Sequence, residues 1–235
     1  MVEANKNIFF RHLLDLMRLT TSAKCKPTAE DWFNKSVVLY DRGNYADAIK
    51  ALDEAIRLAP SDPNNAIAWN NKGLAHYYQG EYGEAVKAYE EAIRLNPKEA
   101  DAWIGKGSAL GKQGKYDEAV KAYEEATRLD PKHEMAWYNK GNALDEQGKY
   151  DESIKAFDEA IRLDPNDAAA WSNKGVAFFS QGEYDDAIKC YDEAIRIDSN
   201  DVAAWYNKGV ALEKLGRNDE ANAAFAKAKE LGYTG

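Results

Sequence analysis

The six tryptophans of this chain lie on one lattice, and no other feature restricts the possible folds as strongly. They follow one another at intervals of 37, 34, 34, 34 and 34 residues: Trp32, Trp69, Trp103, Trp137, Trp171 and Trp205. A fixed period of this length is the signature of a repeat protein, in which each unit buries its apolar face against its neighbours. We therefore expect the 235 residues to form mainly one stacked array.

Two series of small residues divide each period into two helices. The first series follows the tryptophan by four positions, where a small side chain lets two helices approach closely: Ser36, Gly73, Gly107, Gly141, Gly175 and Gly209. The second series is placed where a first helix would end and a turn begin: Gly43, Gly80, Gly114, Gly148, Gly182 and Gly216. Each period is therefore expected to hold one helix on either side of a turn.

The second helix of each period has a pattern of its own. We expect it to open at the tyrosine that follows the turn, which is Tyr45, Tyr82, Tyr116, Tyr150 or Tyr184. Small and aromatic residues then recur in steps of three and four, which places them on one helix face. The helix is expected to stop before Pro60, Pro97, Pro131 and Pro165. The fifth and sixth periods have Ser199 and Tyr233 instead, so their helix ends rest on weaker signals.

This order of Trp, small residue, Gly, Tyr, Ala, aromatic residue, Ala and Pro resembles the tetratricopeptide repeat. The resemblance covers six units, at residues 29–62, 66–99, 100–133, 134–167, 168–201 and 202–235. It implies an all-α fold, a right-handed superhelical solenoid of antiparallel helix pairs. It also implies that the first helix of each pair lines a concave groove.

The two ends of the array are expected to be closed in different ways. Residues 1–28 form an apolar helix and a linker in our interpretation, and the helix is expected to cap the first repeat. The alternatives are docking into a groove, either its own or that of another copy in a homo-oligomer, and contact with a membrane surface. At the other end, the surface that a seventh repeat would cover is polar, through Asn218, Asn222 and Lys229.

A column of amides occupies one groove position. In the family that this chain resembles, the groove is lined by the second, fifth, sixth, ninth, twelfth and thirteenth residues of each repeat. The sixth position holds Asn34, Asn71, Asn139, Asn173 and Asn207, with Gly105 as the interruption, and Asn142 adds an amide at a ninth position. An amide can pair with both the C=O and the N–H of an extended peptide. Peptide recognition is the favoured interpretation, and hydrogen bonding to neighbouring helices is the alternative.

Aromatic and long apolar residues surround the amide column. The groove positions supply Phe33, Tyr40, Tyr77, Tyr78, Met135, Tyr138, Phe179 and Tyr206. Tyrosine offers a large contact area with a polar end. We select Tyr77, Tyr78, Tyr138 and Tyr206 as peptide-binding candidates beside the asparagines. The alternative is that several of these rings only close the gaps between adjacent first helices.

Two patterns of charge recur through the repeats. A lysine follows the amide position in every repeat: Lys35, Lys72, Lys106, Lys140, Lys174 and Lys208. Because this position turns away from the groove, we expect a packed stem and an ammonium group that reaches a carboxylate, while acidic ligands would gain if the ammonium groups reached the groove. On the second helices, an acid precedes an arginine by four residues, as in Asp53 and Arg57 or Glu90 and Arg94, and these are expected to pair.

Composition and motifs argue against several classes of function. A net charge of −9 argues against a nucleic acid partner. The two cysteines, Cys25 and Cys190, and the scattered His12, His76 and His133 form no metal-binding pattern, so no metal or other cofactor is expected. No apolar run is long enough for a membrane span, and the cytoplasm is the default location. No catalytic motif was found.

These observations favour a protein–protein interaction scaffold, not an enzyme. We expect its concave groove to bind a peptide segment of a partner protein through the asparagine column and the aromatic residues. The alternative is a self-associating structural scaffold, in which the groove or the N-terminal helix contacts another copy. The fifth groove position carries none of the lysines of family members that clamp a C-terminal carboxylate. The identity of the ligand does not follow from the sequence.

Overall fold

The computed structural model describes residues 26–62 and 64–234, and within these ranges the regular structure is entirely helical. The helices are α2 (Ala29–Asp41), α3 (Tyr45–Leu58), α4 (Asn65–Tyr78), α5 (Tyr82–Leu95), α6 (Ala100–Lys112), α7 (Tyr116–Leu129), α8 (Glu134–Glu146), α9 (Tyr150–Leu163), α10 (Ala168–Gln181), α11 (Tyr184–Ile197), α12 (Val202–Lys214) and α13 (Asn218–Glu230). The expected cap helix of the N-terminal segment lies outside the described residues.

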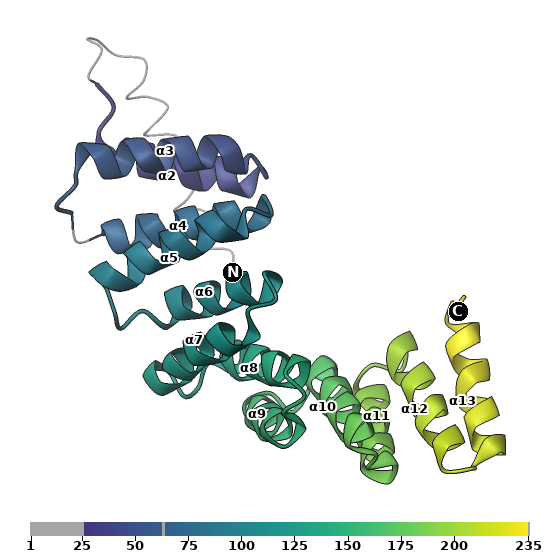
Figure 1. The fold of residues 1–235 in the computed structure, drawn as a ribbon. Coiled ribbons are helices and arrows are strands. Elements are labelled where there is room, and N and C mark those ends of the chain that lie inside the picture. The colour runs from purple at the N-terminus through teal and green to yellow at the C-terminus, as the bar shows by residue number, and fades with distance from the viewer. Residues whose placement is uncertain (1–25, 63, 235) are drawn as a thin grey trace.

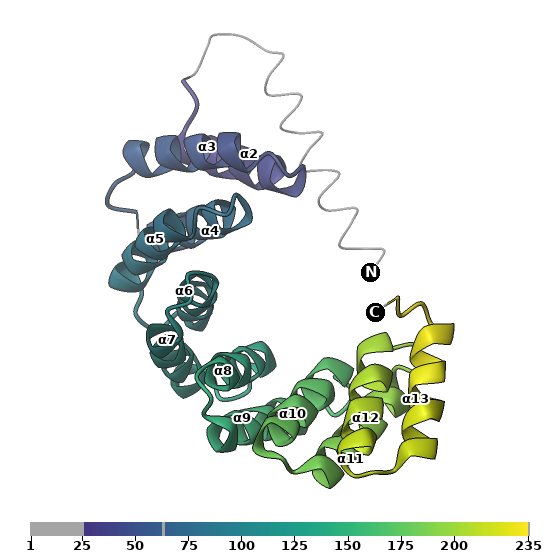
Figure 2. The ribbon, with the colours of Figure 1, turned by 45° about the vertical axis from the view of Figure 1, so that its right-hand side comes forward.

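The helices form six antiparallel pairs that stack into an arc (Figure 1). Each helix packs against the helix before it and the helix after it, and first helices of adjacent pairs also touch. The first helices, from α2 to α12, follow the inner side of the arc and the second helices follow the outer side (Figure 2). The expected all-α solenoid is confirmed, and each pair falls within one expected repeat except that α4 begins one residue early, at Asn65.

The turn between the two helices of each pair depends on glycine. The six glycines of the second small-residue series have φ between 72° and 83°, a left-handed conformation that other residues rarely adopt. The second helix then begins within two residues, and in five repeats its first residue is the expected tyrosine.

An aromatic ring over a glycine forms the centre of most repeats. In the fourth repeat, a Cβ atom at Gly141 would lie 2.7 Å from the ring of Phe157, so only glycine fits there. The same contact pairs Gly73 with Tyr89 and Gly175 with Tyr191. These three rings are at most 2% exposed, and burying a ring of this size contributes about 1.5–3 kcal/mol. In these repeats, the close approach of the two helices of a pair therefore follows from this one contact.

Four of the six tryptophans bond the loop that precedes their own repeat. The indole Nε1 of Trp103 donates to the carbonyl of Pro97 at 3.2 Å, and Trp137 and Trp171 make the equivalent bond. In the next repeat, Trp205 donates to the carbonyl of Ser199 at 3.1 Å. Because a backbone carbonyl accepts this bond, serine can replace proline, and α11 ends two residues before it as the other second helices do.

Candidate peptide-binding groove

The lysine column points away from the groove and connects neighbouring repeats. Each lysine from the second repeat onward reaches an acid on the second helix of the preceding repeat. The Nζ–carboxylate distances are 2.6 Å for Lys72–Asp53, 2.8 Å for Lys106–Glu90, 3.5 Å for Lys140–Glu124, 2.6 Å for Lys174–Asp158 and 2.5 Å for Lys208–Asp192. These lysine side chains are only 15–22% exposed. The expected packed stem and paired ammonium group are therefore confirmed.

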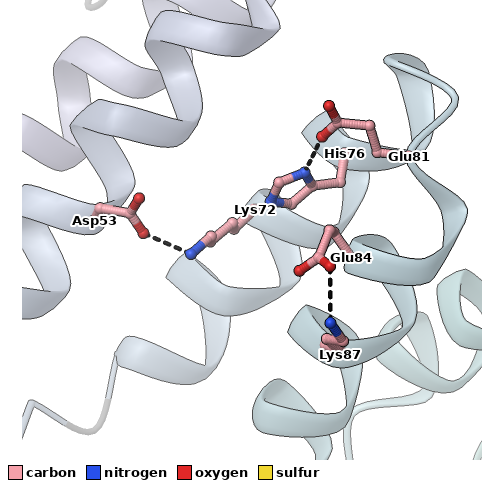
Figure 3. Close-up of polar contacts among 6 residues, drawn as sticks. All are labelled: Asp53, Lys72, His76, Glu81, Glu84 and Lys87. Atoms are coloured by element: carbon pink, nitrogen blue, oxygen red, sulfur yellow. Dashed lines mark hydrogen bonds and ion pairs between the residues drawn. The ribbon is translucent and has the colours of Figure 1, made fainter.

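The same lysines lie over the tryptophan rings. In all six repeats the Nζ atom lies 4.4–5.8 Å from the centre of the ring of its own repeat, within the range of a cation–π contact. Figure 3 shows Lys72 extending from α4 to Asp53 on α3. Acidic ligands in the groove gain nothing from ammonium groups held in this way.

The expected charge pairs within the second helices are wrong. Each arginine instead bonds the glutamate three residues before it: Arg57 with Glu54, Arg94 with Glu91, Arg128 with Glu125, Arg162 with Glu159 and Arg196 with Glu193. The acid four residues before the arginine is taken by the lysine of the next repeat. The spacings of three and four both bring side chains together on a helix, so the sequence alone did not decide between them.

His76 and Cys190 are both packed inside the array and do not face an open site. The His76 side chain is 12% exposed, and its Nδ1 lies 2.7 Å from a Glu81 carboxylate oxygen (Figure 3). Cys190 is buried in α11, and burial raises the pKa of its thiol to about 11. Among the described residues, no group of three or more potential ligands could hold a metal ion.

Four of the five column amides make no side-chain hydrogen bond within residues 26–62 and 64–234. Asn34 is exposed, and Asn71, Asn139 and Asn207 are half-buried on the inner helices. Asn173 differs, because its Nδ2 donates to the Tyr138 hydroxyl at 3.0 Å and to Asn142 Oδ1 at 2.9 Å. Local hydrogen bonding therefore accounts for Asn173 only, and the other four amides keep their donors and acceptors.

The interruption of the column at Gly105 has a steric cause. A Cβ atom there would lie 2.8 Å from the hydroxyl of Tyr89 and closer still to its ring. Tyr89 belongs to α5 of the preceding repeat and is 2% exposed, and burial raises its pKa. The sequence pattern placed the aromatic residues of the second helices on one helix face. Only the orientation of the Tyr89 ring shows that it also contacts the first helix of the next repeat.

The groove aromatics fall into two groups. Three of the expected rings contact an aromatic ring on the second helix of their own repeat, with centroid distances of 6.0 Å for Tyr138–Phe157, 5.2 Å for Phe179–Tyr184 and 5.6 Å for Tyr206–Phe225. Tyr206 also stacks on Tyr233 at 4.2 Å, a contact that sequence reasoning missed. Tyr78 and Met135 remain exposed, at 56% and 57%.

The other group is a tyrosine cluster at the end of the first two repeats. It consists of Tyr40, Tyr45, Tyr77, Tyr78 and Tyr82, with neighbouring ring centroids 5.3–5.9 Å apart. Tyr45 and Tyr82 were expected only as helix starts. They join the cluster because each second helix begins directly beside the end of its first helix, so the sequence did contain this signal.

A small cavity opens beside this cluster, between the first two repeats. Its volume is about 80 Å³, and it is lined by Ser36, Val37, Tyr40, Ala48, Leu52, Asn71 and Leu74. The column amide Asn71 and the groove aromatic Tyr40 therefore border the same space. None of its lining residues carries a charge.

Acidic residues predominate at the groove positions. Six acids stand against two bases: Glu30, Asp41, Asp101, Asp145, Glu146 and Glu213 against Lys112 and Lys214. One Asp145 carboxylate oxygen is buried without a hydrogen-bond partner among the described residues. Burial raises the pKa of this carboxyl group, and the charge of Glu146 raises it further. The electrostatic character of the surface is therefore opposite to that needed for an acidic ligand.

Comparison with known proteins agrees with this architecture. A family model described as tetratricopeptide repeat matches residues 33–100, 70–134, 104–168, 138–202 and 173–232. A crystal structure of MamA is 28% identical, with a TM-score of 0.65, over 68% of this chain and 93% of that chain. No curated protein gave a significant match.

Two further solved structures share the fold. A tetratricopeptide repeat protein from Parabacteroides merdae is 21% identical with a TM-score of 0.76, over 87% of this chain and 80% of that one. YrrB, a protein with an unusual peptide-binding site, is 23% identical with a TM-score of 0.66, over 78% of this chain and 93% of its own. Within the described residues, no helix is both long and apolar enough to cross a membrane.

Proposed function

Because this chain belongs to the tetratricopeptide repeat family, we propose that it is a protein-interaction scaffold whose concave groove binds an extended peptide segment of a partner protein. The observation that carries the proposal is the row of four amides, Asn34, Asn71, Asn139 and Asn207, which have no intramolecular partner among the described residues. YrrB, which has the same fold and is described as having an unusual peptide-binding site, supports a peptide-binding role. We propose binding and not catalysis as its role.

The amides suit a ligand with a regular backbone. An extended peptide presents N–H and C=O groups alternately, and each asparagine side chain offers both a donor and an acceptor. Because the four asparagines occupy the same position of the first, second, fourth and sixth repeats, they contact a backbone at several points along the groove without requiring a particular sequence. Exposed groove residues such as Tyr78 and Met135 add contact area for side chains of the ligand.

The charge of the groove favours a ligand segment that contains lysine or arginine. Acids outnumber bases at the groove positions, and Asp145 has a buried oxygen without a partner among the described residues. A basic side chain placed there would compensate this desolvated group. Binding of such a segment should weaken as the salt concentration rises.

A triple substitution of the free amides tests the proposal. Peptides are first selected from a random phage-displayed library on the full chain, and one is synthesised with a fluorophore. Changing Asn71, Asn139 and Asn207 to alanine removes several hydrogen bonds of about 0.5–1.5 kcal/mol each, so affinity should fall about 10- to 1000-fold. Asn222→Ala, the same change at an exposed site on α13, is the control.

The result depends on folding being unchanged. Circular dichroism should show the same helicity in parent, triple variant and control, because none of these amides bonds to the described part of the chain. Equal affinity of the triple variant and the parent would reject the amide column as the binding site. Sedimentation of the full chain without peptide tests the self-associating alternative, since the scaffold proposed here is a monomer.

A further inference from the structure

The first repeat lacks the ring-over-glycine contact that forms the centre of the others. In the second repeat, the Tyr89 ring lies so close to Gly73 that a Cβ atom would be 2.9 Å away. The first repeat has Ser36 at the glycine position and Leu52 at the ring position. Leucine is shorter than tyrosine or phenylalanine, so the space at the end of the ring is not filled. The cavity of about 80 Å³ lies there, with both residues in its wall.

The wall of this cavity is almost entirely apolar. Val37, Leu74, Leu52 and Ala48 supply aliphatic surface, and Tyr40 adds a ring. The Ser36 hydroxyl is already satisfied, because Oγ donates to the Phe33 carbonyl at 2.6 Å. A pocket with such a lining favours an apolar group over a charged or strongly hydrated one.

One polar side chain in the wall has no partner among the described residues. Asn71 belongs to the amide column, so it lies where the backbone of a bound peptide is proposed to run. Val37 is another lining residue and is 40% exposed, which shows that the cavity borders the open surface of the inner helices. An apolar pocket and an unpaired amide therefore lie side by side. Together they can anchor one peptide residue, because the pocket takes its side chain and the amide pairs with its backbone.

Exposed apolar side chains also occur on the two inner helices that line the pocket: Val37 is part of its wall, and the Tyr78 ring contacts the lining residue Tyr40. Val37, Ile67 and Tyr78, all on α2 and α4, are 40%, 50% and 56% exposed. Grouped apolar exposure of this kind marks interaction surfaces more often than single exposed residues do. Exposed apolar residues beside an apolar pocket are what a docked peptide side chain would cover.

We propose that this pocket receives a branched aliphatic side chain, of leucine, isoleucine or valine, from the bound peptide, while Asn71 pairs with the peptide backbone beside it. The inference rests on the proposed function and assigns the anchor position within the groove. Size decides against an aromatic anchor, because a cavity that binds benzene measures roughly 150 Å³, whereas this one measures about 80 Å³. The anchor sets the register in which the rest of the peptide meets the column.

Methyl NMR titration of the full chain tests the pocket without knowledge of the natural ligand. The probes are N-acetyl-leucinamide, N-acetyl-phenylalaninamide and N-acetyl-alaninamide. We expect saturable shifts of the Val37, Leu52 and Leu74 methyl signals with the leucine probe only. Absence of these shifts, or equal response to the phenylalanine probe, would overturn the proposal.

Filling the pocket provides the second test. Leu52→Phe introduces the ring that the other repeats have, and Leu52→Met is the control of similar volume. The leucine probe should no longer shift the methyl signals of Leu52→Phe, and a library-selected peptide should bind it about 10- to 100-fold more weakly. If the new ring prevents folding, the double variant Ser36→Gly with Leu52→Phe restores the glycine-over-ring pair of the other repeats.

The results distinguish failure of the pocket proposal from failure of the proposed peptide-binding function. Replacing the aliphatic anchor of the selected peptide by alanine should weaken binding to the parent and have little further effect on Leu52→Phe. If the parent binds no selected peptide, the proposed function fails. If the parent and Leu52→Phe bind a peptide equally well, peptide binding stands and the pocket proposal is rejected.

Discussion

Two asparagines of the same column should respond in opposite ways to the same substitution. Asn173 donates two side-chain hydrogen bonds, to the Tyr138 hydroxyl at 3.0 Å and to Asn142 Oδ1 at 2.9 Å. Asn139, one repeat earlier, makes none among the described residues. Changing each to alanine therefore compares a structural amide with a free one at equivalent positions of α10 and α8.

The expected sizes follow from the bonds removed. A neutral hydrogen bond contributes about 0.5–1.5 kcal/mol net, so Asn173→Ala loses about 1–3 kcal/mol. Alanine has the higher helix propensity and returns about 0.5 kcal/mol of this. The net loss of unfolding free energy is therefore about 0.5–2.5 kcal/mol. For Asn139→Ala only the propensity remains, and the variant should equal the parent or exceed it by about 0.5 kcal/mol.

Urea unfolding followed by circular dichroism gives the comparison. Because a repeat array need not unfold in a single step, hydrogen exchange of the α8–α10 amides should be measured with it. We expect faster exchange in Asn173→Ala than in the parent and no change in Asn139→Ala. Equal urea midpoints and equal exchange for the two variants would refute the distinction between structural and free amides.

Three further predictions follow from described contacts. Gly105→Asn should destabilise the fold by about 1–3 kcal/mol, because the new side chain overpacks the Tyr89 ring. Gly111→Asn is the control, since nothing lies within 4 Å of a Cβ atom there, and urea unfolding midpoints compare the two variants. Asp158→Asn should lower the free energy of unfolding by less than about 1 kcal/mol, because the carboxylate that it removes from the Lys174 pair is half-exposed. At ~1 M salt, the melting temperatures of this variant and the parent should be equal. Burial raises the pKa of Cys190 from 9.0 to about 11 and that of Tyr123 from 10.0 to about 12. Because the unfolded chain releases these protons first, their contribution to stability should be fully present below pH 9 and should be lost between pH 9 and 12 in urea titrations. A profile that stays flat over this alkaline range would contradict the prediction.

Local signals were sufficient to predict the fold. The turn glycines, the tyrosines that open the second helices and the prolines after them each act within a few residues, and the helix boundaries agree with them. The position of the lysine column also followed from helical periodicity. Such features could be predicted because they depend on the backbone and on one helix at a time.

The details of the groove depend on contacts between repeats and could not be predicted. Whether Asn173 is free depends on Tyr138, 35 residues earlier in the chain. Whether position 105 can hold an amide depends on the direction of the Tyr89 ring. The partner of each arginine depends on which acid the lysine of the next repeat binds. The small cavity exists because Leu52 occupies a position where the other repeats have an aromatic ring. A periodic sequence pattern does not contain these relations.

The lysine–acid pairs between successive repeats also have a mechanical consequence. Each pair joins a flexible lysine stem to a half-exposed carboxylate on the neighbouring repeat, as in Lys174 and Asp158 at 2.6 Å. A joint of this kind tolerates a small rotation without losing its contact, whereas the buried rings inside each repeat do not. Because the same joint recurs along the arc, small rotations add up over its length. The array should therefore be elastic. The distance between α2 and α13 changes on ligand binding, while every repeat keeps its internal packing.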